Sequence, residues 1–241
     1  MKKYIKFFKY LIEFIVIIIF YFIFKILGLK ISTFISRKIF NIFGSIFRSK
    51  KVVSKNLKIA FPKITEIEIE NFTNKMWNYY GEIFVEYLFL KKFRYGDLNK
   101  NIEVVGQHIL DEIKSKGESV IFISGHFDNF ELMAMTIEKS GIKLSAIYRP
   151  LNNFFMNKIM ESLRTKYICK NQIKKGRSSL RDLLRLFNNG SSIALMIDQR
   201  VSEGIKSKFF NKDAYTTTIP AQFVKKFNCK VVPINIERKQ N

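Results

Sequence analysis

The feature that most restricts the fold is an alternation of short apolar runs and amphipathic segments that begins beyond Gly96. Runs rich in β-branched residues predict strands, and apolar residues at three- and four-residue spacing predict helices between them. The predicted strands are residues 102–105, 119–124, 143–148, 192–197 and 230–236, and the predicted helices are 108–116, 130–139, 153–166, 178–187 and 219–227. This order is typical of an α/β layered domain with a mostly parallel central sheet flanked by helices. Functional sites in such domains form in the loops beyond the carboxyl ends of the strands.

Two further segments precede this core. Residues 7–28 are apolar apart from Lys9, Glu13 and Lys25, and as a helix they reach about 33 Å, enough to cross a bilayer. More basic residues follow the stretch than precede it, which predicts a single-pass anchor with the body on the cytoplasmic side. A buried hydrophobic hairpin helix is the alternative.

The connection between anchor and core is predicted to be helical. Residues 31–47 suit an amphipathic helix on an anionic membrane surface, and a core helix almost as well. From Lys50 the helical pattern runs to about Leu90 with a break at Phe61-Pro62, and Thr65 with Glu68 predicts a capping box. The expected division is therefore 1–29 membrane anchor, 30–95 helical membrane-proximal segment and 96–241 α/β core.

The chain is strongly basic, with Lys+Arg 42 against Asp+Glu 20 and a net charge of +22. Such a field attracts nucleic acid, anionic lipid or an acidic carrier protein, although a biased composition accounts equally well for its size. The basic residues are spread along the whole chain without a nucleic-acid-reading motif, so a membrane-tethered nucleic-acid-binding protein or scaffold is only the non-enzyme alternative. Two cysteines and two histidines do not suit a disulfide framework or a zinc cluster.

The segment SGHFDNFE, residues 124–131, carries the chemistry. His126 follows a glycine at the predicted carboxyl end of a strand, and a carboxylate lies in the first turn of the next helix. A carboxylate on one ring nitrogen fixes the tautomer, so that the other nitrogen can take a proton from a substrate hydroxyl. Asp128 and Glu131 are both candidates for this carboxylate.

The string GHFDNFE resembles the H-x4-D/E signature of the glycerolipid acyltransferases, and within them the late acyltransferases of lipid A biosynthesis. Further segments agree in order and spacing: Asn56-Leu57, Ala60-Phe61-Pro62, Tyr148-Arg149-Pro150, Arg164, Lys174-Lys175-Gly176, Asp198-Gln199, Phe209-Phe210 and Thr216-Thr217-Thr218 with Pro220. The chain departs from the family at Asp128, where glycine is usual, and at Phe130, where tryptophan is usual. Family members also run further, so a C-terminal strand and helix are expected to be missing.

The resemblance implies transfer of a fatty acyl group from acyl carrier protein, or coenzyme A, to a hydroxyl of a lipid A precursor at the bacterial inner membrane. His126 would be the catalytic base and Glu131 its partner, with no metal or organic cofactor. Residues implied to bind substrate are Arg149, Arg164, Lys175, Gly176, Asp198 and Asn129. An acyltransferase for another membrane glycolipid or phospholipid is the nearest alternative.

Overall fold

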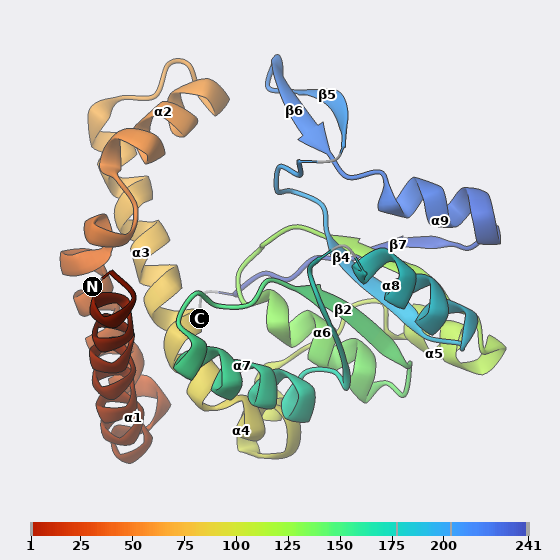
Figure 1. Cartoon of the computed structure of the whole chain (residues 1–241), viewed down its shortest axis with the longest axis horizontal. Coiled ribbons are helices and arrows are strands. Elements are labelled where there is room, and N and C mark those ends of the chain that lie inside the picture. Colours follow the sequence, from red (N-terminus) through yellow and green to blue (C-terminus); the bar gives the residue numbers. More distant parts are fainter. Residues whose placement is uncertain (1, 177, 203, 240–241) are drawn as a thin grey trace. The chain divides into compact units, whose positions relative to one another are not determined.

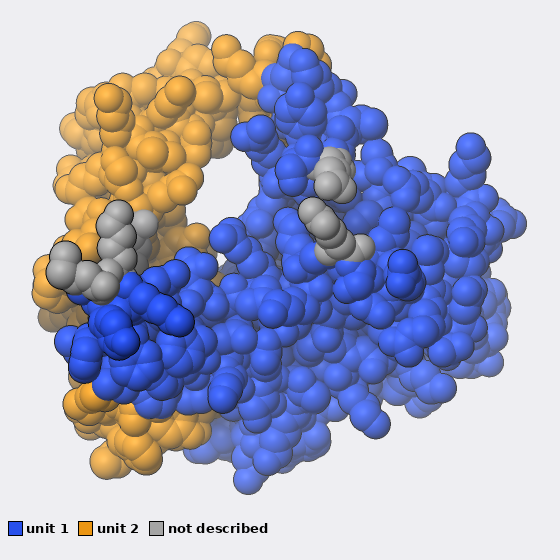
Figure 2. Space-filling model, viewed as in Figure 1, with its two compact units in different colours: residues 1–14, 90–207, 213–241 blue, residues 15–89, 208–212 orange. Residues whose placement is uncertain are grey.

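The computed structural model describes residues 2–176, 178–202 and 204–239, so the outermost residues of the expected anchor and core lie outside the described part. The chain divides into two compact units, coloured separately in Figure 2. The first unit comprises residues 1–14, 90–207 and 213–241, and the second comprises residues 15–89 and 208–212.

A parallel sheet forms the centre of the first unit. Its strands are β1 (Ile121–Ser124), β2 (Leu144–Tyr148), β3 (Asn171–Lys174), β4 (Ser192–Met196) and β7 (Val231–Pro233). Their order is β3-β2-β4-β1-β7, and every recorded pairing is parallel (Figure 1). The predicted fold class is therefore confirmed, and β4 lies between β2 and β1, both of which precede it in the chain.

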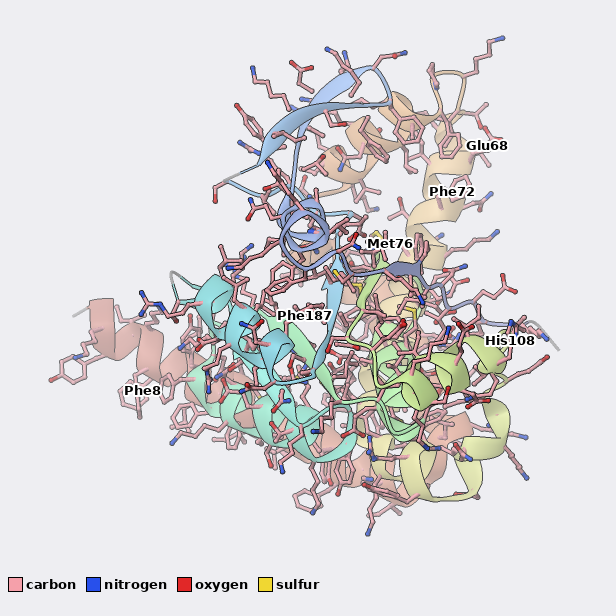
Figure 3. All side chains as sticks on the ribbon, turned by 90° about the vertical axis from the view of Figure 1, so that its right-hand side faces the viewer. Phe8, Glu68, Phe72, Met76, His108 and Phe187 are labelled. Atoms are coloured by element: carbon pink, nitrogen blue, oxygen red, sulfur yellow. The ribbon has the colours of Figure 1, made fainter. Side chains whose placement is uncertain are left out.

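Helices cover both faces of this sheet. They are α5 (Gln107–Lys116), α6 (Phe130–Lys139), α7 (Phe154–Tyr167), α8 (Ser179–Asn188) and α9 (Ile219–Phe227). Leu183 and Phe187 of α8 and Phe223 of α9 pack against Ile121 and Ile193 in one core cluster, and Phe187 is labelled in Figure 3. Because side chains alternate along a strand, Phe122 and Ser124 of β1 face the side of the sheet opposite to Ile121. There the Ser124 hydroxyl contacts the sulfur of Met133 on α6.

The strand predictions failed where the chain is polar or irregular. Residues 102–105 form no strand: they follow α4 (Leu90–Tyr95) and the 3-10 helix η1 (Asp97–Asn101) as irregular chain. Strand β3 was missed because it is a polar run on the sheet edge. Strands β5 (Ile205–Phe209) and β6 (Lys212–Thr216) were missed because β5 is exposed throughout and buries no apolar face.

The second unit contains α2 (Lys50–Ala60) and α3 (Glu66–Leu88). The break at Phe61-Pro62 and the capping box are confirmed, since the Thr65 side chain accepts the Glu68 N–H at 3.3 Å and Glu68 accepts the Thr65 N–H at 2.8 Å. The backbone N–H and the hydroxyl of Thr65 both donate to the Glu68 carboxylate and hold its pKa below its usual value.

Helix α1 (Lys2–Phe47) is interrupted at Gly28, whose φ of 75° and ψ of 172° suit only glycine. Phe24 and Phe40 lie on either side of this break, and both contact the ring of Phe84 on α3, at 6.5 and 5.8 Å between centroids. Sixteen residues of straight helix would separate them by about 24 Å. The chain therefore reverses at Gly28, and Ser32 closes the turn with a 3.0 Å hydrogen bond to the Phe24 carbonyl.

The limb of α1 that follows Gly28 packs closely on α3. The Ser36 hydroxyl donates to the Gly81 carbonyl at 2.9 Å, and Arg37 pairs with buried Glu82 at 2.6 Å. A side-chain carbon at Gly44 would lie 2.2 Å from the ring of Trp77, so only glycine permits this approach. One face of residues 31–47 thus serves as a core face, while several large apolar side chains on the limb stay exposed.

Candidate active site

His126 and Asp198 are brought together by the register of two neighbouring parallel strands. Ser124 of β1 lies beside Met196 of β4, and each functional residue follows two positions later. His126 Nδ1 lies 2.8 Å from Asp198 Oδ1, and the His126 backbone N–H donates to Asp198 Oδ2 at 2.8 Å. One carboxylate therefore fixes both the backbone and the ring of the histidine.

The contacts of the ring define its tautomer. The ionised Asp198 carboxylate can only accept at Nδ1, so Nδ1 carries the proton and Nε2 keeps its lone pair. Nε2 faces the side-chain amide of Gln199 at 3.4 Å, and Phe130 packs edge-on against the ring with centroids 4.9 Å apart. The His126 side chain is 33% exposed, so an incoming hydroxyl can reach it.

Gly125 allows this arrangement. A side-chain carbon at this position would lie 2.9 Å from the Phe127 ring and 3.3 Å from Asp198 Oδ2. A larger residue would therefore push the loop away from Asp198.

Glu131 does not take the place expected for it. Among the residues that the structure describes, the ring of His126 bonds to Asp198 and Gln199, not to Glu131. Glu131 is 5% exposed in the first turn of α6 and accepts from Arg164 of α7, whose Nε lies 2.9 Å from Oε1. The first turn of α6 faces α7 rather than the end of β4, so the Glu131 carboxylate pairs with the Arg164 guanidinium.

Arg164 is thus part of a polar cluster behind the loops. Its guanidinium lies 5.8 Å from the centroid of the Tyr148 ring, and the Tyr148 hydroxyl donates to Glu161. Burial, together with that hydrogen bond, raises the pKa of Tyr148 to about 12. The hydrogen bonds from Tyr148 and Asn157 hold the pKa of Glu161 below its usual value.

Asp128 serves neither the ring nor a helix cap. Its φ of 38° lies in the left-handed region, which explains why glycine is usual here in the family that the sequence resembles. Its carboxylate accepts the Asn129 N–H at 2.9 Å and pairs with Arg238 at 2.8 Å. Asn129, not Asp128, is the N-cap residue of α6, and its backbone carbonyl accepts the Leu132 N–H at 3.0 Å.

The remaining predicted residues divide into an exposed group and a buried one. Arg149 follows β2, while Lys175 and Gly176 follow β3, and all three are exposed. The Lys175 N–H donates to the Tyr148 carbonyl at 2.9 Å, so the β2–β3 ladder continues to the site edge and places Arg149 beside Lys175. Asn129 is buried behind the loop.

The residues that the structure describes contain no cluster of three or more His, Cys, Asp or Glu side chains suited to a metal ion. The absence of a cofactor stays a prediction. His108 is exposed on α5 and is labelled in Figure 3.

These features define a class of protein: an α/β fold with a histidine–carboxylate pair at the carboxyl ends of its strands, an arrangement that is chemically able to activate a hydroxyl. The family model for bacterial lipid A biosynthesis acyltransferases matches the chain over residues 1–241. The chain belongs to this family and is an acyltransferase of lipid A biosynthesis. None of the curated proteins matches it.

One N-terminal segment, Lys3–Ile46, is long and apolar enough to cross a membrane, judged by length and composition alone. This finding agrees with a membrane-anchored enzyme of lipid A biosynthesis.

Proposed function

We propose that this acyltransferase moves a fatty acyl chain from the thioester of acyl carrier protein to a hydroxyl of a lipid A precursor, with His126 as general base. The observation that carries the proposal is the 2.8 Å contact between His126 Nδ1 and Asp198, which leaves the lone pair on Nε2, where a substrate hydroxyl can take the place of the long 3.4 Å contact with Gln199. Coenzyme A is the alternative donor.

The chemical steps follow from this geometry. Nε2 removes the proton of the acceptor hydroxyl as its oxygen attacks the thioester carbonyl, forming the new carbon–oxygen bond. Asp198 stabilises the imidazolium that results. The tetrahedral intermediate then expels the thiolate, which takes the proton back from His126. The substrate hydroxyl is the nucleophile, so no covalent acyl-enzyme forms.

The acceptor is proposed to bind by its phosphate groups. Arg149 and Lys175 directly follow neighbouring strands, whose backbones lie about 4.8 Å apart, at the same end of the sheet as His126. Two exposed cations on adjacent chain segments suit a phosphate, which the guanidinium can bind through two hydrogen bonds. Arg164, by contrast, is proposed to hold Glu131 and the start of α6 rather than substrate.

The location proposed for the enzyme is the cytoplasmic side of the inner membrane, where acyl carrier protein is present. The basic residues that flank the apolar stretch support this side, and the net positive charge of the chain also favours an acidic carrier protein as donor.

The test is an acyl-transfer assay with radiolabelled acyl carrier protein and a tetra-acylated lipid A precursor, in parallel with acyl coenzyme A. His126→Ala should lower the rate by about 10²–10⁴-fold because a positioned base contributes that much. His108→Ala, a matched change on exposed α5, should have no effect. A His126→Ala enzyme that keeps more than about a tenth of the rate would exclude His126 as the base.

A further inference from the structure

The N-terminal limb of α1 is bound to the catalytic unit at the start of α7. Asn153 caps α7 by accepting the Phe155 N–H at 3.1 Å. Its amide group donates to the Tyr10 carbonyl at 2.9 Å and to Glu13 Oε2 at 3.1 Å. Asn153 is buried, and Glu13 also pairs with Lys9 at 3.8 Å. Polar bonds thus fix residues 10–13, in the middle of the first limb, to the same unit as His126.

Aromatic packing reinforces this attachment. The Phe155 ring lies 5.6 Å from that of Phe7 and 5.4 Å from that of Phe14, while the Phe154 ring lies 6.3 Å from that of Tyr10. Two turns of the limb therefore pack against the first turn of α7.

This contact limits how far the N-terminus can lie from the catalytic unit. Lys3 precedes Tyr10 by seven residues, or about 11 Å of helix, whereas the hydrocarbon core of a bilayer is about 30 Å thick. Residues 149–153, between β2 and α7, are irregular chain, and they include the exposed Arg149. Irregular chain and an exposed cation do not lie against lipid tails, so the start of α7 belongs at or outside the headgroup level.

The remaining part of the first limb is too short to cross the membrane. The charge-free run 14–24 is about 17 Å long as a helix, roughly the thickness of one leaflet. The chain then reverses at Gly28, and Arg37 and Glu82 form the second limb's ion pair with α3. Within the described residues, the part of the first limb that lies between residue 14 and the break at Gly28 is therefore shorter than the roughly 20 apolar residues that a single crossing needs.

The surface of α1 nevertheless suits lipid. Large apolar side chains on the limbs are exposed, among them Tyr4, Ile5, Phe8, Ile12, Ile15, Ile19, Phe22, Ile26 and Ile31, and Phe8 is labelled in Figure 3. Exposed Lys3, Lys6 and Lys9 alternate with these residues near the N-terminus, and Lys30 follows the turn. Apolar faces edged by lysines are typical of segments that lie in an anionic interface.

We infer that α1 is a hairpin that lies in the headgroup region of the near leaflet of an anionic membrane, with its first limb held by the first turn of α7 and the exposed Lys30 of its turn at the headgroup level, so that the N-terminus lies on the same side as the catalytic unit. This inference rests on the proposed membrane location but replaces the single-pass topology expected from the sequence. It also places the exposed Phe154, which packs against Tyr10 of the limb, and the exposed Leu151 of the preceding loop at the headgroup level, near Arg149.

Labelling of single cysteines tests the inference without measuring activity. In the full chain with Cys169→Ser and Cys229→Ser, Lys3→Cys reports the N-terminus, Lys143→Cys reports the catalytic unit and Lys30→Cys reports the turn. A membrane-impermeant maleimide is applied to inverted inner-membrane vesicles and to right-side-out spheroplasts, and then again after detergent.

We expect positions 3 and 143 to be labelled in the same preparation, and both to lose labelling in the other preparation until detergent is added. Labelling of position 3 and position 143 in opposite preparations would restore the single-pass anchor and overturn the inference. Labelling of position 30 only from the side opposite position 143 would exclude a hairpin confined to one leaflet.

If the cysteine-free chain does not fold, a second measurement on the unaltered protein gives the same information. An N-terminal epitope tag on the unaltered protein is exposed to protease in the same two preparations. Loss of the tag only in the preparation in which trypsin can also cleave at Lys143 supports the hairpin. Loss of the tag only in the other preparation overturns it. A protein that is inactive but gives the expected pattern would refute the proposed reaction alone.

Discussion

Asp198→Asn is the substitution that separates this site from the one expected from the sequence. Asparagine has nearly the size of aspartate, and its side-chain oxygen can still accept the His126 backbone N–H. In the wild-type structure this nitrogen lies 2.8 Å from Asp198 Oδ2. The amide nitrogen of the asparagine, however, would donate to His126 Nδ1, where the carboxylate accepts. The ring would then carry its proton on Nε2, which could no longer take one from a hydroxyl.

The size of the effect follows from this change of tautomer. In a comparable serine-protease arrangement the same substitution lowers turnover by about 10⁴-fold. The Asp198 side chain is 41% exposed here, so water can partly replace it. We therefore expect a loss of about 10²–10⁴-fold, equivalent to about 2.7–5.4 kcal/mol of transition-state stabilisation. The free energy of unfolding should change by less than about 1 kcal/mol, because the hydrogen bond from the His126 backbone N–H to the side chain at position 198 survives.

The measurement is kcat for acyl transfer and Tm, in one detergent, for Asp198→Asn and for the control Asp182→Asn. Asp182 lies on α8 in an exposed pair with Arg185, so its change should leave both quantities unaltered. Should Asp198→Asn keep more than about a tenth of kcat while its Tm is normal, Asp198 does not orient the base, and the argument from the strand register is wrong.

Three further outcomes are expected. Glu131→Gln should lower Tm by roughly 10 °C as well as lowering activity, because it leaves the Arg164 guanidinium buried without its carboxylate; an unchanged Tm with no activity would instead indicate a direct catalytic role. Asp128→Asn should remain active, since asparagine tolerates a φ of 38° and the Asp128 side chain does not touch the ring, so an inactive variant would contradict this assignment. Burial raises the pKa of the Cys169 thiol to about 12 and also raises that of Cys229, but Cys169 is buried whereas Cys229 is only partly so. At pH 8 a disulfide reagent should therefore modify Cys229 first, and faster reaction of Cys169 would show that it is not buried in solution.

The sequence predicted the sheet well because buried parallel strands have strong apolar runs. Helices α6 and α9 begin and end where the periodicity placed them. Strands β3 and β5 could not be predicted in the same way, because an edge strand and an exposed hairpin bury little and need no apolar pattern.

The site was predicted in part. The motif and the strand-end rule identified His126, and the rule also pointed to the loop that carries Asp198. The pairing was not accessible because it depends on β4 lying directly beside β1 in a fixed register, and strand order is a tertiary property. The resemblance to the family favoured Glu131 as the partner of His126, whereas in the structure the first turn of α6 directs Glu131 toward Arg164.

The position of β4 has a consequence for how the protein is made. A chain that has emerged only as far as residue 190 contains β1 and β2, but the strand that pairs with both has not been synthesised. Until β4 inserts, two apolar strands present open edges toward each other, and such edges are where nascent chains aggregate. Because Asp198 follows β4 by two residues, the same insertion that closes these edges completes the catalytic pair. Activity can therefore arise only late in folding, after the central gap in the sheet has been filled.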